Sequence, residues 1–130
     1  MKRIIVLGAV IEKDGKILLA RRKQGQGMAD KWEFPGGKPQ SSEDEKEWLK
    51  NKIFDDIKAD IEVVDFFAET IYGMGKRELN LRCYRAKLLS DKINSPCRDS
   101  FVWAVQEKIL DYDLSPADIK IANKLVYNRK

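Results

Sequence analysis

The segment from Trp32 to Ala59 constrains the fold of this chain more than any other part of it. Residues 32–38 read Trp-Glu-Phe-Pro-Gly-Gly-Lys, a short apolar strand that proline and two glycines break sharply. Beyond this turn, apolar residues recur at helical spacing, at Trp48, Leu49, Ile53 and Ile57. The sequence therefore predicts a tight glycine turn that leads into an amphipathic helix.

This helix is expected to run over residues 43–57. Ser41 or Ser42 is a good N-cap, and Ser42 together with Glu45 forms a capping-box pattern. Asp55 and Asp56 lie off the apolar side of the helix, where their carboxylates could bind a metal ion. Acidic helix faces are more commonly only solvated, so the helix alone leaves both interpretations open.

Composition indicates a globular chain with one domain, residues 1–130. Hydrophobic residues make up 43% and charged residues 35%, and no apolar run approaches the roughly 20 residues that span a bilayer. We therefore expect a cytoplasmic protein without membrane association. The net charge of +4 favours phosphorylated partners. No nucleic-acid-binding signature accompanies it, so we expect no sequence-specific nucleic-acid binding, and either a monomer or a homodimer.

The chain contains no histidine, which excludes Ser-His and Cys-His nucleophiles and histidine-based zinc sites. Carboxylates remain as the plausible catalytic side chains. The two cysteines, Cys83 and Cys97, form no C-x-x-C pair, so we expect ordinary reduced thiols.

The pattern of apolar runs and turn residues predicts an α/β fold, with a mixed β-sheet flanked by helices. A hairpin is expected around Lys13-Asp14-Gly15, and a second one around Gly73-Met74-Gly75, between strands at 61–71 and 78–88. A short strand is expected at 101–103 and a helical turn at 105–110. Ser115 and Pro116 open the last helix, and Asp118 in its first turn is expected to contribute to capping.

The central segment resembles the Nudix box, G-x5-E-x7-R-E-U-x-E-E-x-G-U, in which U is an aliphatic residue. The residues of this chain that fit the pattern are Gly37, Glu43, Ile53, Asp55 and Asp56. Asn51 and Lys52 replace its Arg-Glu pair, and Lys58 replaces its late glycine. Outside the box, further segments are similar to the MutT-type branch, at 8–11, 16–22, 32–38, 101–103 and 114–119.

Within that branch the chain looks nearest to (d)CTP pyrophosphohydrolases and 8-oxo-dGTP diphosphatases. The resemblance implies the α/β/α sandwich of the Nudix fold and a nucleoside triphosphate ligand. It also implies cleavage to a nucleoside monophosphate and pyrophosphate with Mg²⁺ as cofactor, and with Mn²⁺ as the alternative ion.

The resemblance assigns roles to individual residues. The implied metal ligands are the Gly37 carbonyl group, Asp55 and Asp56. The two aspartates would also serve catalysis, together with Glu43, whose family role is chiefly structural. The implied substrate-binding residues are Arg22, Glu33, Phe34, Lys38 and Asp118. A carboxylate at Asp118 could accept a hydrogen bond from an exocyclic amino group such as cytosine N4.

The departures from the box affect mainly the metal site. Aspartate is one methylene shorter than glutamate, and a lysine ammonium cannot coordinate a metal ion. At its spacing Lys52 can pair with Asp55 and Asp56 and so take the place of the cation. A further family glutamate falls on Cys97, with Asp99 two residues away.

Two functions therefore stay open. One is a slow, Mg²⁺-dependent nucleoside triphosphate pyrophosphohydrolase that uses Asp55 and Asp56. The other is a catalytically impaired Nudix domain that binds a nucleotide as a sensor or partner module. The sequence does not determine the preferred nucleobase, or whether that base is damaged.

Overall fold

The computed structural model describes residues 2–21, 30–40, 44–90 and 101–127. This part of the chain forms a mixed β-sheet with flanking helices, which confirms the predicted α/β fold. The elements, in chain order, are β1 (Lys2–Lys13), β2 (Lys16–Arg21), β3 (Trp32–Glu33), β4 (Gly36–Gly37), α1 (Glu45–Ile57), β5 (Ile61–Met74), β6 (Arg77–Leu88), β7 (Phe101–Val105), the 3-10 helix η1 (Gln106–Asp111) and α2 (Pro116–Tyr127).

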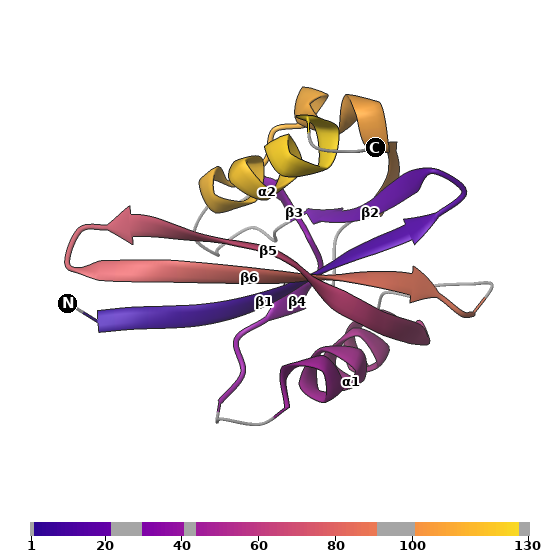
Figure 1. Cartoon of the computed structure of the whole chain (residues 1–130), viewed down its shortest axis with the longest axis horizontal. Coiled ribbons are helices and arrows are strands. Elements are labelled where there is room, and N and C mark those ends of the chain that lie inside the picture. Colours follow the sequence, from indigo (N-terminus) through magenta and orange to yellow (C-terminus); the bar gives the residue numbers. More distant parts are fainter. Residues whose placement is uncertain (1, 22–29, 41–43, 91–100, 128–130) are drawn as a thin grey trace.

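The sheet is built around β1. The strand order is β3-β2-β1-β6-β5, with β4 paired to β1 and β7 paired to β2. Strand β1 is antiparallel to β2 and parallel to β6, and β5 is antiparallel to β6. Figure 1 shows α1 on one side of this sheet and α2 on the other, an α/β/α arrangement. None of the helices in the described ranges is both long and apolar enough to cross a membrane.

Side-chain alternation along the strands divides the core into two clusters. On β6, Leu81 and Cys83 belong to the cluster that contains Ile121 of α2. Tyr84 belongs to the opposite cluster, with Ile53 of α1. The sheet therefore has two apolar faces, each of which is covered by one helix.

The first hairpin forms as predicted, whereas the second turn lies further along the chain. Asp14 and Gly15 have φ of 54° and 78°, as a two-residue type I′ turn requires. Strand β5 continues to Met74, so its predicted end at Ile71 is wrong. Gly73 pairs with Glu78 inside the ladder, and the turn comes at Gly75, where φ is 67°.

The start of α1 also differs from the prediction. The N-cap is Asp44, whose Oδ1 accepts hydrogen bonds from the backbone N–H groups of Lys46 at 2.9 Å and Glu47 at 3.2 Å. The capping box between Ser42 and Glu45 is therefore wrong. An aspartate directly before the first helical turn satisfies two of the exposed N–H groups by itself.

The end of α1 keeps the backbone geometry of a glycine cap without the glycine. Lys58 adopts a left-handed conformation with φ 55° and ψ 33°, and its N–H donates to the Phe54 carbonyl oxygen at 2.9 Å. The left-handed region costs a residue with a side chain about 1–2 kcal/mol. Packing holds the chain here nevertheless, because Ile57 and Ala59 on either side are both buried.

Candidate functional site

A cleft of about 710 Å³ opens beside the first half of β1. The strand segment around the glycine turn, the second half of α1, the β5–β6 hairpin and the start of α2 all contribute to its walls. Six of the residues predicted to bind substrate or metal line it, namely Glu33, Phe34, Gly37, Lys38, Asp56 and Asp118. Arg77 and Ser115 also line the cleft, although neither of them was predicted from the sequence to bind a ligand.

The wall formed by α2 carries a buried carboxylate. Asp118 is only 6% exposed, and its Oδ1 accepts a hydrogen bond from the Phe34 backbone N–H at 3.1 Å. Burying a charged group is costly unless it is hydrogen-bonded, so this bond fixes the start of α2 against the segment before the glycine turn. Ser115 does not cap α2 as predicted, since its buried Oγ has no hydrogen-bond partner among the described residues.

Cys83 lies beneath this wall as a free, buried thiol. Burial raises its pKa well above the ordinary value, and the negative charge of Asp118 raises the pKa further. The thiol is therefore protonated at neutral pH and has little nucleophilic character. This agrees with the prediction of an ordinary thiol for Cys83, whereas Cys97 lies outside the described residues.

The opposite wall carries an ion pair. Lys52 Nζ lies 3.3 Å from Asp56 Oδ1, one helical turn away on α1. The lysine stem extends across Gly37, because a Cβ atom placed on this glycine would lie 3.0 Å from Lys52 Cε and 3.4 Å from Trp48. The missing side chain at Gly37 thus makes room for Lys52, whose ammonium group reaches the cleft.

Asp55 is not part of this wall. It is exposed and lines a separate hollow with Lys50, Asn51, Phe54 and Asp60. Successive residues of an α-helix are rotated by about 100°, and α1 is oriented on the sheet so that Asp56 faces the cleft while Asp55 faces the other hollow. Of the two aspartates expected to act together as ligands, the structure brings only Asp56 into the cleft.

Comparisons with known proteins decide the family. The sequence profile of the NUDIX domain matches residues 6–124, which is nearly the whole chain. The chain belongs to the Nudix family. It is 31% identical over 121 residues to the CTP pyrophosphohydrolase of Escherichia coli (strain K12), covering 93% of this chain and 90% of that protein. It is 29% identical over 121 residues to the putative 8-oxo-dGTP diphosphatase 2 of Mycobacterium tuberculosis (strain ATCC 25618 / H37Rv), covering 91% and 84%.

Solved structures agree with this assignment. A MutT protein of the Nudix hydrolase family from methicillin-resistant Staphylococcus aureus 252 superimposes with a TM-score of 0.80 at 32% identity, covering 99% of this chain and all of that one. A MutT protein from Methanosarcina mazei Go1 gives a TM-score of 0.84 at 22% identity, over 99% and 97% of the two chains, and so supports the fold alone. The predicted MutT-type resemblance is confirmed.

Membership of the Nudix family raises the question of whether the site fits a divalent metal ion. Mg²⁺ prefers an octahedral shell of oxygen ligands at about 2.0–2.1 Å. Within the described ranges, no three acidic or cysteine side chains gather closely enough to hold a metal ion. Of the carboxylates that line the cleft, Asp56 is already paired with Lys52, whose stem lies against Gly37. The described residues therefore do not fit a resident Mg²⁺ ion.

Four residues with expected roles in the Nudix site lie outside the described ranges. These are Arg22, Glu43, Cys97 and Asp99. Their roles at the substrate, in the box and on the loop before β7 stay predictions.

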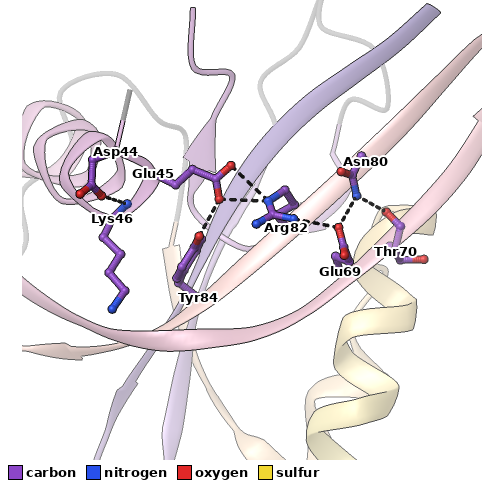
Figure 2. A network of polar contacts seen from close by, with 8 residues as sticks. All are labelled: Asp44, Glu45, Lys46, Glu69, Thr70, Asn80, Arg82 and Tyr84. Carbon is purple, nitrogen blue, oxygen red and sulfur yellow. Dashed lines mark hydrogen bonds and ion pairs between the residues drawn. The ribbon is translucent and has the colours of Figure 1, made fainter. Parts of the chain in front are cut away.

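A polar network holds the start of α1 on the sheet, as Figure 2 shows. Glu45 Oε1 accepts hydrogen bonds from Tyr84 Oη at 2.6 Å and from Arg82 Nε at 3.0 Å. Arg82 Nη1 also donates to Glu69 Oε1 at 3.0 Å, which accepts from Asn80 Nδ2 at 3.1 Å. Burial raises the pKa of Tyr84, and the hydrogen bond to Glu45 raises it further. The network fixes the helix that carries Lys52 and Asp56.

The sequence contained only a weak signal for this network. Asn80, Arg82 and Tyr84 alternate with apolar residues along β6, which indicates a shared sheet face but not its partners. The sequence pattern predicts a capping-box role for Glu45, not this contact with the sheet.

Proposed function

We propose that this Nudix protein binds a nucleoside triphosphate in the cleft and hydrolyses it only slowly to the nucleoside monophosphate and pyrophosphate. One observation carries the proposal. The Lys52–Asp56 ion pair lies across Gly37, at the box positions where the Nudix pattern has glutamates, in an otherwise well-formed cleft.

The arrangement of charge in the cleft supports a nucleotide as ligand. Asp118 is bonded to Phe34 on one wall, and Lys52 lies against Gly37 on the other. Gly37 is three positions after Phe34 in the sequence, so their Cα atoms are at most roughly 10 Å apart. An amino-bearing base at Asp118 and phosphates at Lys52 would place both ends of one nucleotide beside groups of opposite charge. The CTP pyrophosphohydrolase relative favours cytosine as that base.

The same ion pair accounts for a low rate. Hydrolysis of a phosphoanhydride needs neutralised phosphate charge, a positioned water molecule and a base. Lys52 and Lys38 supply positive charge to the cleft, but the carboxylate of Asp56 is already engaged by Lys52. The cleft therefore keeps the groups that bind the nucleotide but lacks a free carboxylate of Asp56 for its hydrolysis. A nucleotide-binding module without turnover is the second candidate, and the engaged Asp56 carboxylate favours it.

A panel of nucleotides tests the proposal. Binding and product release are measured for NTPs and dNTPs, including 5-methyl-dCTP and 8-oxo-dGTP, with Mg²⁺, Mn²⁺ or EDTA. We expect measurable binding of cytosine nucleotides, with monophosphate and pyrophosphate as the slow products. Binding without any product would select the second candidate. The absence of binding across the whole panel would contradict both.

Asp118→Asn is expected to lower the preference for CTP over UTP by roughly tenfold, which is about 1.4 kcal/mol. The asparagine oxygen can still accept the Phe34 N–H bond, but the charged acceptor for a cytosine amino group is lost. The ratio of the two dissociation constants is measured by calorimetry.

Asp113→Asn is the matched control, because Asp113 is exposed, pairs with Lys31 and does not line the cleft. It should leave the CTP/UTP ratio unchanged. An unchanged ratio in Asp118→Asn itself would remove Asp118 from base recognition.

A further inference from the structure

We infer that Lys52 holds the phosphates of the bound nucleotide directly, so that this cleft binds its nucleotide without a divalent metal ion. The inference rests on the proposed function and specifies how the phosphate end of the site works. It starts from the misfit between the described residues and a Mg²⁺ ion.

Lys52 is placed so that its stem is held and its ammonium group can contact a ligand. Its stem packs against Gly37, beside which the Trp48 ring also lies, while its side chain remains 37% exposed on the side of the cleft. The apolar part of the lysine is thus fixed, and the ammonium group stays accessible to a ligand. A fixed cation at the end of a cleft is suited to a polyanion.

Lys52 has more hydrogen-bond donors than its ion pair with Asp56 uses. An ammonium group has three donors, and the ion pair with Asp56 accounts for one of them. At 3.3 Å this pair is longer than the roughly 2.7–2.9 Å of a strong charged hydrogen bond. Partly exposed pairs of this kind contribute little to stability, so phosphate oxygens can join or replace Asp56 as acceptors.

Neighbouring charges favour phosphate at the same place. Lys38 follows Gly37 directly and also lines the cleft. The cleft contains three basic side chains, Lys38, Lys52 and Arg77, against three acidic ones, Glu33, Asp56 and Asp118. At the Gly37 end, two of the basic residues, Lys38 and Lys52, meet the acidic residue Asp56, whereas Asp118 lies on the α2 wall. No metal ion is needed to make the Gly37 end attractive to an anion.

The direction in which Mg²⁺ changes the affinity for CTP distinguishes this site from one that depends on a metal ion. Mg²⁺ bound to a triphosphate neutralises two of its negative charges and so weakens its attraction to lysine. A site that lacks its own cation would instead need the Mg²⁺ complex. We therefore expect wild-type protein to bind CTP in EDTA at least as tightly as in excess Mg²⁺.

The experiment measures CTP binding by calorimetry in EDTA and in Mg²⁺, for wild type and three variants. Lys52→Met keeps the apolar stem and loses the charge, and should weaken binding in EDTA roughly tenfold. Lys52→Arg keeps a cation and should bind within about threefold of wild type. Lys50→Met is the matched control, because Lys50 is on the same helix but lines the other hollow, and its binding should match wild type.

Each outcome has a defined meaning. Binding seen only with Mg²⁺ would overturn this inference and leave the proposed function intact. Full affinity of Lys52→Met in EDTA, with a normal thermal unfolding curve, would also overturn it. If neither condition gives binding of any nucleotide, the proposed function fails together with the inference.

Discussion

Gly36→Ala is expected to lower the free energy of unfolding by about 3–5 kcal/mol. Gly36 has φ of 157°, and a Cβ atom there would lie 2.0 Å from the Leu7 carbonyl oxygen and 3.0 Å from Gly8 Cα. These neighbours are backbone atoms of the central strand β1, so they cannot move aside as a flexible side chain would. The loss is a large share of the stability of an ordinary domain. Urea unfolding followed by circular dichroism measures it.

Gly73→Ala is the matched control for this substitution. Gly73 lies in β5, and a Cβ atom there would meet nothing within 4 Å. Its alanine variant should unfold within about 0.5 kcal/mol of wild type. Equal stability of the two alanine variants would show that β4 does not need the close approach to β1. The position of Gly37 at the cleft would then have to be explained by something other than the pairing of β4 with β1.

Lys52→Glu is expected to raise Mg²⁺-dependent hydrolysis of CTP by at least roughly tenfold. The substitution replaces the ammonium group beside Asp56 and Gly37 with a carboxylate, so two acidic side chains and a backbone carbonyl group become available as oxygen ligands. It also restores the glutamate of the Nudix pattern at this position. Release of pyrophosphate under steady-state conditions measures the change.

The same variant should lose binding of CTP in EDTA, so one substitution changes two measurements in opposite directions. Lys50→Glu reverses the same charge on the far side of α1 and serves as the control, with both measurements close to wild type. Hydrolysis that stays at the wild-type rate in Lys52→Glu would mean that the position of Asp55, rather than Lys52, limits the reaction. Asp56→Glu would not then be expected to help alone.

Local sequence signals predicted those elements whose structure is decided by residues adjacent in the sequence. The hairpin at Asp14-Gly15 follows from turn preferences, and the start of α2 at Pro116 follows from the preference for proline at the first helical position; both act over a few residues. The path of β5 through Gly73 could not be predicted in this way, since a glycine without positive φ is compatible with a strand when a partner strand is present.

The candidate site was predicted in part for the same reason. The resemblance to the Nudix box indicated which positions should meet at Gly37, and the helical spacing of Lys52 and Asp56 predicted their ion pair. The direction of Asp55 was not accessible, because it depends on how α1 is rotated against the sheet. That rotation is fixed by contacts distant in sequence, such as those of Glu45 with Arg82 and Tyr84.

The parallel pairing of β1 with β6 also bears on how the chain is made. Lys2 pairs with Arg77 and Glu12 with Lys87, and partners of this ladder are 75 residues apart. At about 5–20 residues per second, synthesis of the intervening chain takes roughly 4–15 s. During that time the central strand has one open edge, to which another nascent chain could add a strand. Slower translation between β1 and β6 should therefore lower the yield of folded protein. This consequence follows from the order of the strands in the sheet and not from any single residue.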